Sequence, residues 1–245
     1  MKAPRIYLPV PLVQGACVTL DADVARHVKR VLRLRSGDPL ILFDGRGHEW
    51  HARLRQTAGP EPQAEIVHAL ESGKRESSLD ILLMQGISRG ERMDYTLQKA
   101  VELGVKQISP IWVERSQVKL SGERLAHRMR HWQRIVIHAC EQSGRNVIPP
   151  LKSPESLHES LSQVRASELC LLLEPAGEYR LCDFAQSPTS VTILAGPEGG
   201  LTESETLLAR HSGFLPLRLG PRILRTETAG LAAIAALQLL WGDFC

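Results

Sequence analysis

Two turns rich in glycine and proline, close to the end of the chain, constrain its fold more than any other feature. Each follows an apolar stretch typical of a strand and precedes the start of a helix, the first within 192–205 and the second within 217–230. Such turns let a ligand approach the backbone, and the helix start presents unpaired N–H donors. Small molecules bind at the carboxyl ends of sheet strands, so the pair predicts one shared cofactor pocket.

The composition is that of an ordinary globular protein, with 245 residues, 43% hydrophobic and 23% charged. The longest apolar run, 230–241, contains Gln238 and is too short to cross a bilayer, so it predicts a buried helix. Pro4, Pro9 and Pro11 interrupt the apolar N-terminal stretch, which argues against an export signal. The five cysteines form no C-x-x-C pair and indicate reduced thiols. We therefore expect a cytoplasmic protein with no membrane segment.

The excess positive charge lies in the first third of the chain. Residues 1–75 hold 12 Lys and Arg against 8 Asp and Glu, whereas the remaining residues hold 18 against 19. The run 26–35 has five cations and no acid, which is the pattern that attraction of phosphates requires. This run favours contact with a nucleic acid, and a solvated helix face is the alternative interpretation.

The N-terminal part, 1–73, has the pattern of a small β-rich unit. A helix is expected to begin at Asp21 as its N-cap and to carry the basic run 26–35. Turns are expected at 44–45 and 58–60, and the polar run 73–78 is the best linker. The predicted strands are 6–8, 17–20, 39–43, 49–55 and 64–69.

From residue 74 to 245 strands and helices alternate, which predicts an α/β unit with a mostly parallel sheet. The predicted strands are 79–84, 107–113, 168–173, 190–195 and 214–219. The predicted helices are 91–103, 123–142, 153–162, one opened by the capping box Thr202–Glu205, and 226–241. The small residues of the last helix allow close packing against another element, and a second subunit is one candidate.

Two further motifs in the sequence could support other chemistries, hydrolysis and zinc binding. GISRG at 86–90 is a literal G-x-S-x-G between a strand and a helix, the context of a hydrolase nucleophile elbow. It follows the first strand of the α/β unit, and no histidine follows the last strand, so a turn is favoured, with Arg89 able to meet phosphate. His127, His131 and His138 share one helical face, but no carboxylate or cysteine partner at the proper offset supports zinc. No metal is expected.

Motifs spread along the chain carry a family resemblance. GPEGGL at 196–201 and LGPRILRTETA at 219–229 form the two turns, and three further motifs accompany them: SRGERM at 88–93, QKAVELGV at 98–105 and ACEQSGRN at 139–146. These segments resemble the 16S ribosomal RNA uridine-N3 methyltransferases of the SPOUT (trefoil-knot) superfamily. RIY at 5–7 and RVLR at 30–33 are similar to the PUA-like N-terminal RNA-binding domain of that family. The resemblance covers essentially the whole chain.

The resemblance implies a small PUA-like β-barrel at 1–73 and a SPOUT methyltransferase domain at 74–245, in which a deep knot holds S-adenosylmethionine. It also implies a homodimer that acts on 16S ribosomal RNA or on the small ribosomal subunit. The cofactor would lie among three loops, at 172–175, 196–201 and 219–229. The residues implied as cofactor contacts are Leu172, Leu173, Glu174, Leu194, Gly196, Pro197, Glu198, Gly199, Gly200, Leu219, Gly220, Ile223, Leu224, Thr226 and Ala229.

Methylation at N3 of uridine requires in-line positioning, loss of the N3 proton and stabilisation of the charge that results. Arg225 is the candidate for stabilising that charge, and Glu227 is a candidate base. Glu198 is a further catalytic candidate, with orientation of its loop as the alternative role. The candidate RNA contacts are Arg5, Arg26, Lys29, Arg30, Arg33, Arg89 and Arg145. A structural ion pair is the alternative for each arginine.

Two other functions remain open on the sequence. A SPOUT enzyme could act on another RNA target, such as the ribose 2′-hydroxyl of a transfer RNA, and would then need a base that acts on an alcohol. An RNA-binding protein that has lost catalysis is the second alternative. Binding of S-adenosylmethionine separates this alternative from an enzyme, and mapping of methylated nucleotides separates the targets.

Overall fold

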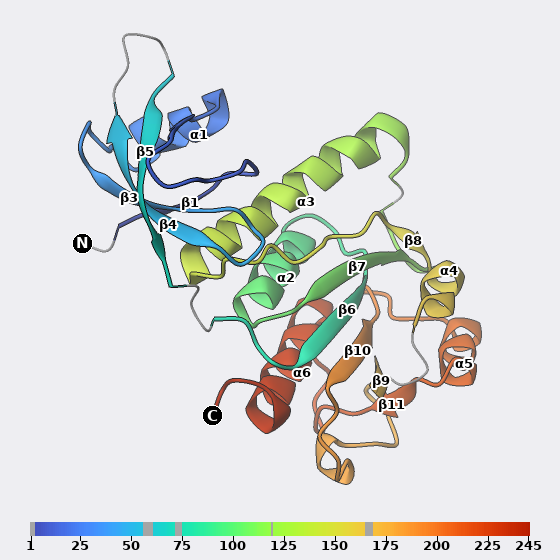
Figure 1. Ribbon diagram of the computed structural model, residues 1–245. Coiled ribbons are helices and arrows are strands. Elements are labelled where there is room, and N and C mark those ends of the chain that lie inside the picture. Colours follow the sequence, from blue (N-terminus) through green and yellow to red (C-terminus); the bar gives the residue numbers. More distant parts are fainter. Residues whose placement is uncertain (1–2, 56–60, 72–74, 119, 165–168) are drawn as a thin grey trace. The chain divides into compact units, whose positions relative to one another are not determined.

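The computed structural model divides into two compact units, each described by itself below (Figure 1). The described residues are 3–245 except 56–60, 72–74, 119 and 165–168. The N-terminal unit comprises the residues up to Glu76 together with Cys140–Ile148, and the α/β unit comprises Ser77–Ala139 with Pro149–Cys245.

The predicted domain boundary, between residues 73 and 74, lies outside the described residues, as do the start of the predicted linker and the turn predicted at 58–60. The grouping of Cys140–Ile148 with the N-terminal unit has no counterpart in the sequence analysis. It depends on contacts between residues that are distant along the chain.

The N-terminal unit is built on a curled mixed sheet with the strand order β1-β3-β4-β5-β2. Only β1 pairs in parallel, with β3, and the other pairings between named strands are antiparallel. Buried residues alternate along the strands, as at Leu40 and Leu42 and at Ala52 and Leu54, because successive side chains of a strand face opposite sides. The strands are β1 (Arg5–Tyr7), β2 (Cys17–Thr19), β3 (Pro39–Phe43), β4 (Glu49–Arg55) and β5 (Gln63–Leu70).

The predicted helix starts where expected but ends early. The side chain of Asp21 accepts hydrogen bonds from Asp23 N and Val24 N and caps α1 (Ala22–Arg26). The chain continues as a π-helical turn, η1 (His27–Val31). Arg33 then takes a φ of 54°, in the left-handed region, which stops the helix. The prediction that the helix carries the whole basic run was therefore wrong beyond Val31.

The segment 140–148 is held to the N-terminal unit by hydrogen bonds along its length. Glu141 Oε1 accepts from Tyr7 N at 3.1 Å. Asn146 Nδ2 donates to the carbonyl of Gly47 at 2.9 Å, and Gly47 N donates back to the Asn146 carbonyl at 3.0 Å. Cys140 is buried here, and burial raises the pKa of its thiol to about 12. This thiol is protonated and inert at neutral pH.

The α/β unit has a six-stranded sheet with the order β11-β9-β10-β6-β7-β8, and all pairings of its described strands are parallel. This confirms the predicted α/β class. The strands are β6 (Asp80–Gly86), β7 (Gln107–Trp112), β8 (Glu155–Ser156), β9 (Leu169–Leu173), β10 (Ser190–Ala195) and β11 (Leu215–Leu217). The predicted strand starting at Glu168 begins at Leu169, and Glu168 lies outside the described residues.

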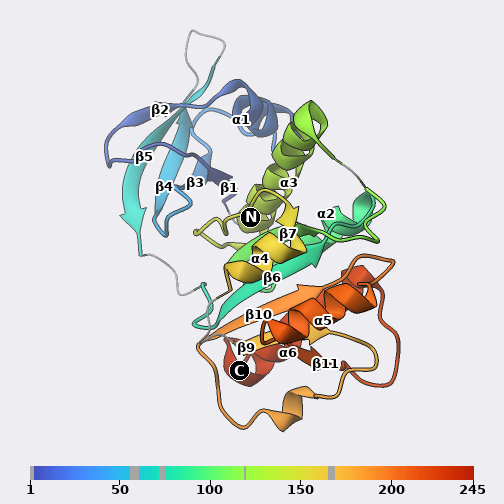
Figure 2. The same cartoon turned by 90° about the vertical axis from the view of Figure 1, so that its right-hand side faces the viewer.

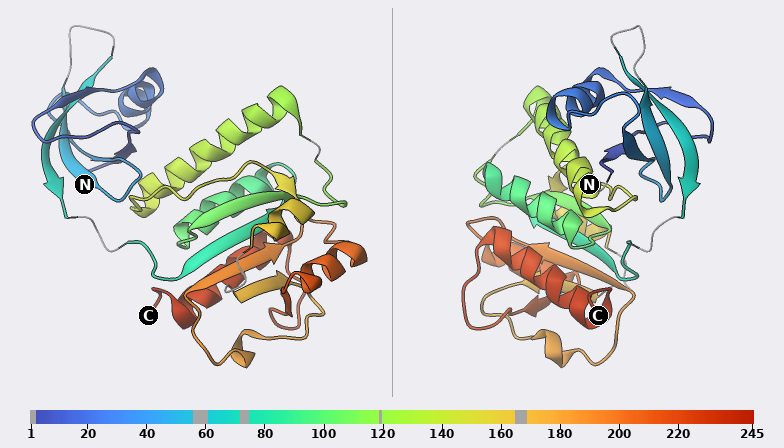
Figure 3. Two further views of the ribbon diagram at one scale, coloured as in Figure 1. Left: turned by 45° about the vertical axis from the view of Figure 1, so that its right-hand side comes forward. Right: turned by 90° about the vertical axis from the view of Figure 1, so that its left-hand side faces the viewer.

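Helices cover both faces of this sheet. Helices α4 and α5 lie on the face seen in Figure 2, whereas α2 and α6 lie on the opposite face, seen in the right panel of Figure 3. The helices are α2 (Glu91–Glu102), α3 (Gly122–Ser143), α4 (Leu157–Ser162), α5 (Glu203–His211), α6 (Thr226–Trp241) and the short 3₁₀ turn Leu181–Asp183. The helix predicted from residue 153 begins only at Leu157, because Ser156 caps it and Glu155–Ser156 pairs with β7.

Gln238 anchors the C-terminal end of α6 against α2. Gln238 is fully buried, donates to the Leu103 carbonyl at 3.0 Å and accepts from Ser77 Oγ at 2.7 Å. Gly104 closes α2 with a φ of 86°, the left-handed conformation that glycine adopts at helix C-termini. None of the helices in the described part of the chain combines the length and the apolar character needed to cross a membrane.

The end of β11 and the residue that follows it pass against the loop after β9. Glu174 N donates to the Leu217 carbonyl and Tyr179 N to the Pro216 carbonyl, both at 3.0 Å. Arg218 N donates in turn to the Tyr179 carbonyl at 2.8 Å. After this crossing α6 packs on β10 and β6, which lie two and three strands away from the edge strand β11. The loops after β9, β10 and β11 are thereby brought together.

Candidate cofactor and active site

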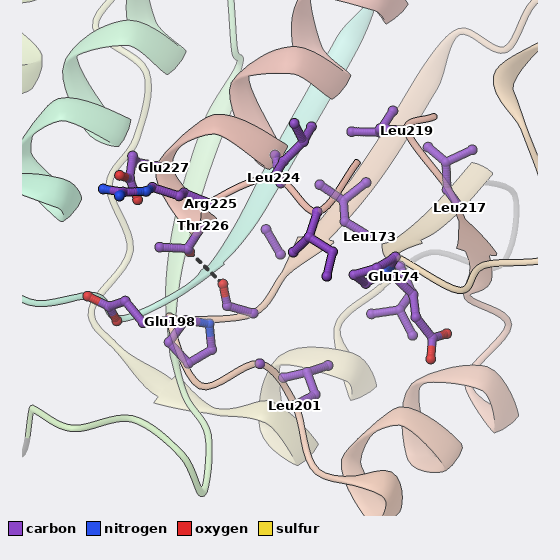
Figure 4. A pocket seen from close by; sticks show the side chains of 18 of the residues that line it. Leu173, Glu174, Glu198, Leu201, Leu217, Leu219, Leu224, Arg225, Thr226 and Glu227 are labelled. Carbon is purple, nitrogen blue, oxygen red and sulfur yellow. Dashed lines mark hydrogen bonds between the residues drawn. The ribbon is translucent and has the colours of Figure 1, made fainter. Parts of the chain in front are cut away.

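The loops after β9, β10 and β11 surround one hollow of about 560 Å³ (Figure 4). The two turns singled out in the sequence thus share a hollow, together with the third loop that the resemblance implied. In Figure 4 the leucines Leu173, Leu217, Leu219 and Leu224 lie toward one side, and the polar residues Glu198, Arg225, Thr226 and Glu227 toward the other. Glu174, also labelled in Figure 4, lies near Leu173 and Leu217, so the leucines gather on one side of the hollow without making that side wholly apolar.

All but two of the implied cofactor contacts line this hollow, and contact with the cofactor stays a prediction. Leu194 belongs instead to the buried core below it, since strand alternation turns its side chain away. Gly199 is not among the lining residues. Ile223 lines the hollow but is 83% exposed, so it lies at the rim of the hollow.

Gly86, at the end of β6, allows the loop after β10 to approach. A Cβ added at Gly86 would lie 2.5 Å from Pro197 Cδ and 2.6 Å from Pro197 N. Any side chain at this position would push the loop away. Gly220 has a φ of 84°, a left-handed conformation that glycine adopts without the penalty of a Cβ. These two glycines position two of the three loops.

A buried hydrogen-bond cluster joins β6, the loop after β10 and the start of α6. Thr226 Oγ1 donates to the Gly196 carbonyl at 2.6 Å, the dashed line of Figure 4. Gln85 is fully buried, and its Nε2 donates to Thr226 Oγ1 at 3.1 Å and to the Gly86 carbonyl at 3.1 Å. These polar groups form hydrogen bonds with one another instead of with water. Separating the loops would therefore leave them unpaired. The cluster fixes the spacing of the two turns.

Glu198 is held by the start of α2. Its Oε1 accepts from Arg89 N at 3.0 Å and from Arg92 Nη1 at 2.9 Å. Burial by itself raises the pKa of Glu198, but the hydrogen bonds from Arg89, from its own backbone and from Arg92 outweigh burial and lower it. Glu198 is therefore ionised and already paired at neutral pH. This geometry favours its role in orienting the loop over a role as a base.

Arg225 and Glu227 lie at the start of α6. Arg225 is the N-cap residue of α6, and its side chain is exposed. Glu227 Oε1 lies 4.0 Å from Arg92 Nε. Glu227 Oε2 is buried and has no hydrogen-bond partner among the described residues. An unpaired buried carboxylate oxygen is costly, and the Glu227 side chain that carries it lines the hollow.

Two arginines outside the predicted site support its loops. Arg115 Nη1 donates to the carbonyls of Gly199 and Leu201, each at 3.1 Å. Arg210, on α5, donates from Nη2 to Glu174 at 3.2 Å and from Nη1 to Glu178 at 3.0 Å. Hydrogen bonds from Arg210 to these two carboxylates raise the pKa of Arg210. No motif in the sequence marks either arginine, because the partners are distant along the chain.

The geometry bears on the two alternative chemistries, hydrolysis at Ser88 and metal binding by the histidines of α3. Ser88, the serine of G-x-S-x-G, is buried, and its Oγ lies 3.4 Å from the Gly86 carbonyl and from Thr226 Oγ1. It is a structural residue of the turn rather than an exposed nucleophile. His131 Nε2 lies 2.7 Å from Asp94 Oδ2. Within the described ranges no group of three or more histidine, cysteine or acidic residues could hold a metal ion.

The candidate RNA contacts separate into exposed and buried residues. Arg26, Lys29, Arg30 and Arg33 are all exposed on α1, η1 and the turn that follows. Arg26 forms an exposed ion pair with Asp23 at 3.4 Å, which solvent screens. Arg89 is exposed beside the loop that carries Glu198. These five side chains are accessible to a ligand.

Arg5 and Arg145 occupy buried ion pairs instead. Arg145 is 3% exposed, and its Nη2 lies 2.6 Å from Glu76. Arg5 is paired with Glu49, and its Nη2 donates to the Arg145 carbonyl at 3.2 Å. For Arg5 and Arg145 the geometry therefore favours a structural ion pair over contact with RNA. The sequence offers no way to separate them from exposed arginines, since burial depends on tertiary contacts.

Comparisons with known proteins agree with this geometry. Residues 75–238 match the family described as the RNA methyltransferase domain, and residues 20–67 match the RNA methyltransferase PUA domain. The ribosomal RNA small subunit methyltransferase E of Buchnera aphidicola from Schizaphis graminum is 33% identical over 242 residues, 99% of this chain and 98% of that protein. The protein of that name from Bacillus subtilis is 29% identical, over 92% of both chains.

Solved structures give the same result. The ribosomal RNA small subunit methyltransferase E of Neisseria gonorrhoeae, bound to S-adenosyl methionine, superposes with a TM-score of 0.94 at 46% identity. That comparison covers 99% of this chain and all of the other. A methyltransferase structure from Legionella pneumophila with bound SAM gives a TM-score of 0.95 at 40% identity, over the full length of both chains. The α/β unit thus has the SPOUT-type knotted fold that the sequence implied, and the chain belongs to the RNA methyltransferase family that includes the small subunit methyltransferases E.

Proposed function

We propose that this protein transfers a methyl group from S-adenosylmethionine to N3 of a uridine in 16S ribosomal RNA, and that it works in the cytoplasm, where that RNA is found. One observation carries the proposal: three loops converge on a single hollow in a fold shared with structures that hold this cofactor. The choice of N3 of uridine rests on the resemblance of GPEGGL and LGPRILRTETA to the family's motifs.

The residues around the hollow suit S-adenosylmethionine. Leu173, Leu219 and Leu224 offer apolar surface to an adenine ring, and the glycine-rich turns expose backbone donors and acceptors to its polar edge. The hollow of about 560 Å³ is within the range of small-molecule sites. The cofactor supplies an electrophilic methyl group on a positively charged sulfur. Glu198 and Glu227 place negative charge on the same side of the hollow as Arg225.

The chain's own residues would then have to deprotonate N3 and stabilise the charge left on the uracil ring. Glu227 is the candidate acceptor of the proton, because its side chain lines the hollow and its Oε2 has no hydrogen-bond partner in the described part of the chain. Arg225 is the candidate to stabilise negative charge on the carbonyl oxygens that flank N3. Gln85 and Thr226 hold the turn that carries both residues in place.

RNA binding is assigned to the exposed cations of the N-terminal unit. The double variant Arg30→Glu with Arg33→Glu is expected to weaken binding of 16S ribosomal RNA, and less so at high salt, because cations release counterions when they contact phosphates. Filter binding at several salt concentrations measures the effect. An affinity equal to that of the wild type at every salt concentration would exclude η1 and the turn after it from RNA binding.

We also propose a homodimer. Leu239, Leu240 and Phe244, at the end of α6, are about half exposed, which is unusual for large apolar side chains so close together. Light scattering is expected to give the mass of two chains, and Leu239→Glu with Leu240→Glu should give the mass of one. A wild-type mass of one chain would contradict the dimer. A variant that keeps the mass of two chains would show that the interface lies on another surface.

Two measurements test the activity. Calorimetric titration with S-adenosylmethionine should show saturable binding, and its absence at millimolar ligand would favour an RNA-binding protein without catalysis. Mapping of methylated nucleotides in cells that lack the protein should reveal one unmethylated uridine N3 in 16S ribosomal RNA. Loss of a ribose 2′-O-methyl group in a transfer RNA instead would favour the alternative target.

A further inference from the structure

A stripe of cationic and titratable side chains lies along α3, outside both the basic run and the hollow described above. We define the α3 stripe as Arg124, His127, His131, Arg134 and His138. The members are alternately three and four residues apart, so they share one face of the helix. The stripe lies within 122–139, the part of α3 that belongs to the α/β unit.

The charge of this segment is one-sided. Between Gly122 and Ala139 there are four arginines and one acid, Glu123. A helix face that is merely exposed to solvent more often carries charges of both signs. Solvent exposure alone therefore accounts poorly for this excess of positive charge. Arg124, His127, Arg134 and His138 are exposed, and the side chain of His131 is 44% exposed although it contacts Asp94. The opposite face buries Trp132 and Val136, which anchors the helix.

The stripe ends at a second hollow, of about 630 Å³, which His138 lines together with Tyr95 and Gln98. Glu227 and Arg92 line both this hollow and the first one. The side chain proposed as the proton acceptor therefore borders both hollows. A molecule that follows the stripe would arrive beside Glu227 from the side opposite the leucines of the first hollow.

The chemistry of the two surfaces differs. The arginines of the stripe suit phosphates, over a length of about 21 Å from a rise of about 1.5 Å per residue. The second hollow is lined by three carboxylates, Glu91, Asp94 and Glu227, and by one arginine, Arg92. Its carboxylates outnumber its arginine and suit a phosphate less well than the stripe does, but they accept hydrogen bonds from the N–H groups of a base. Tyr95 is half exposed and offers a ring on which a base can stack. Backbone and base of one nucleotide strand would fit the stripe and the hollow respectively.

We propose that the α3 stripe binds the phosphate backbone of the RNA substrate, with the base to be methylated entering the second hollow. The inference rests on the proposed function, because it requires an RNA substrate. It adds a contact surface on the α/β unit to the one assigned to the N-terminal unit. A strand held on the stripe would bring its base to the carboxylate of Glu227, which the first hollow approaches from the cofactor side.

The test removes two charges of the stripe without reversing them. Arg124→Gln with Arg134→Gln is expected to raise KM for 16S ribosomal RNA about tenfold and to leave kcat and the affinity for S-adenosylmethionine unchanged. The slope of log affinity against log salt should become shallower by about 1.4, because each lost phosphate contact contributes about 0.7 for a single strand. The matched control is Arg180→Gln with Arg218→Gln, two exposed arginines of the same unit, which should leave KM and the slope unchanged.

Equal KM and equal salt slopes for the stripe variant and the wild type would overturn the inference. A stripe variant that loses its dimeric mass but keeps its RNA affinity would overturn it as well, in favour of contact with a second copy. If the wild type methylates no RNA, the proposed function fails. The comparison of RNA binding between the stripe variant and the control still decides the inference in that case.

Discussion

Replacing Arg225 by alanine is expected to lower kcat for methyl transfer by about 100- to 1000-fold, the effect of removing one group that stabilises charge in a transition state. The affinity for S-adenosylmethionine should change little, because Leu173, Leu219, Leu224 and the backbone of the turns remain in place. Incorporation of a labelled methyl group into 16S ribosomal RNA under single-turnover conditions measures the rate. Calorimetry measures the affinity.

The fold should survive this substitution. Arg225 is exposed, and the first hydrogen bonds of α6 run to its backbone carbonyl, from Thr228 N at 2.9 Å and from Ala229 N at 2.8 Å. Arg218→Ala is the matched control, since Arg218 is also exposed, lies just after β11 and does not line the hollow. Turnover of Arg225→Ala equal to that of the control would remove Arg225 from the mechanism.

Replacing Arg145 by methionine is expected to destabilise the protein by about 3 kcal/mol, the typical cost of breaking a buried ion pair. The change would leave Glu76, whose side chain is 17% exposed, without the guanidinium that now lies 2.6 Å from it. It would also loosen 140–148 from the rest of the N-terminal unit, because the hydrogen bonds from Arg145 Nε and Nη2 to Glu76 are lost. Unfolding in urea, followed by circular dichroism, measures the loss in the free energy of unfolding.

The control for this prediction is an exposed ion pair. Arg180 lies 3.4 Å from Asp183, with 61% of its side chain exposed, so Arg180→Met should lower the free energy of unfolding far less than Arg145→Met does. Equal losses for the two variants would contradict a structural role of Arg145. Where Arg145→Met stays folded, its affinity for 16S ribosomal RNA should match that of the wild type, which separates stability from RNA contact.

Much of the secondary structure could be predicted because it depends on local chemistry. Asp21 and Thr202 cap helices through hydrogen bonds to the following two or three residues, and Gly104 closes α2 in the left-handed conformation. The strands of the α/β unit were recognisable as short apolar runs, since a parallel sheet is buried on both faces. Local rules failed at η1, where no residue signals a change to π-helical hydrogen bonding.

The site was only partly accessible from the sequence. The two turns were marked by glycine and proline, and the family resemblance added the loop after β9. The support from Arg115, Arg210 and Gln85 was not marked, because each acts on backbone or carboxylate groups tens of residues away. The family resemblance implied Leu194 as a cofactor contact, yet its side chain belongs to the buried core.

The sequence by itself determined the α/β class, the starts of most helices and the two turns, because hydrophobic period, capping and glycine chemistry act over a few residues. Only the tertiary structure decided which arginines are accessible: Arg30 and Arg33 are exposed, whereas Arg5 and Arg145 are buried against carboxylates. The sequence predicted a shared pocket, but only the tertiary structure shows the long-range contact of 216–218 with 174–179 that helps to bring the ends of β9, β10 and β11 around one hollow. An identical side chain can bind RNA or stabilise a core, and its distant neighbours determine which.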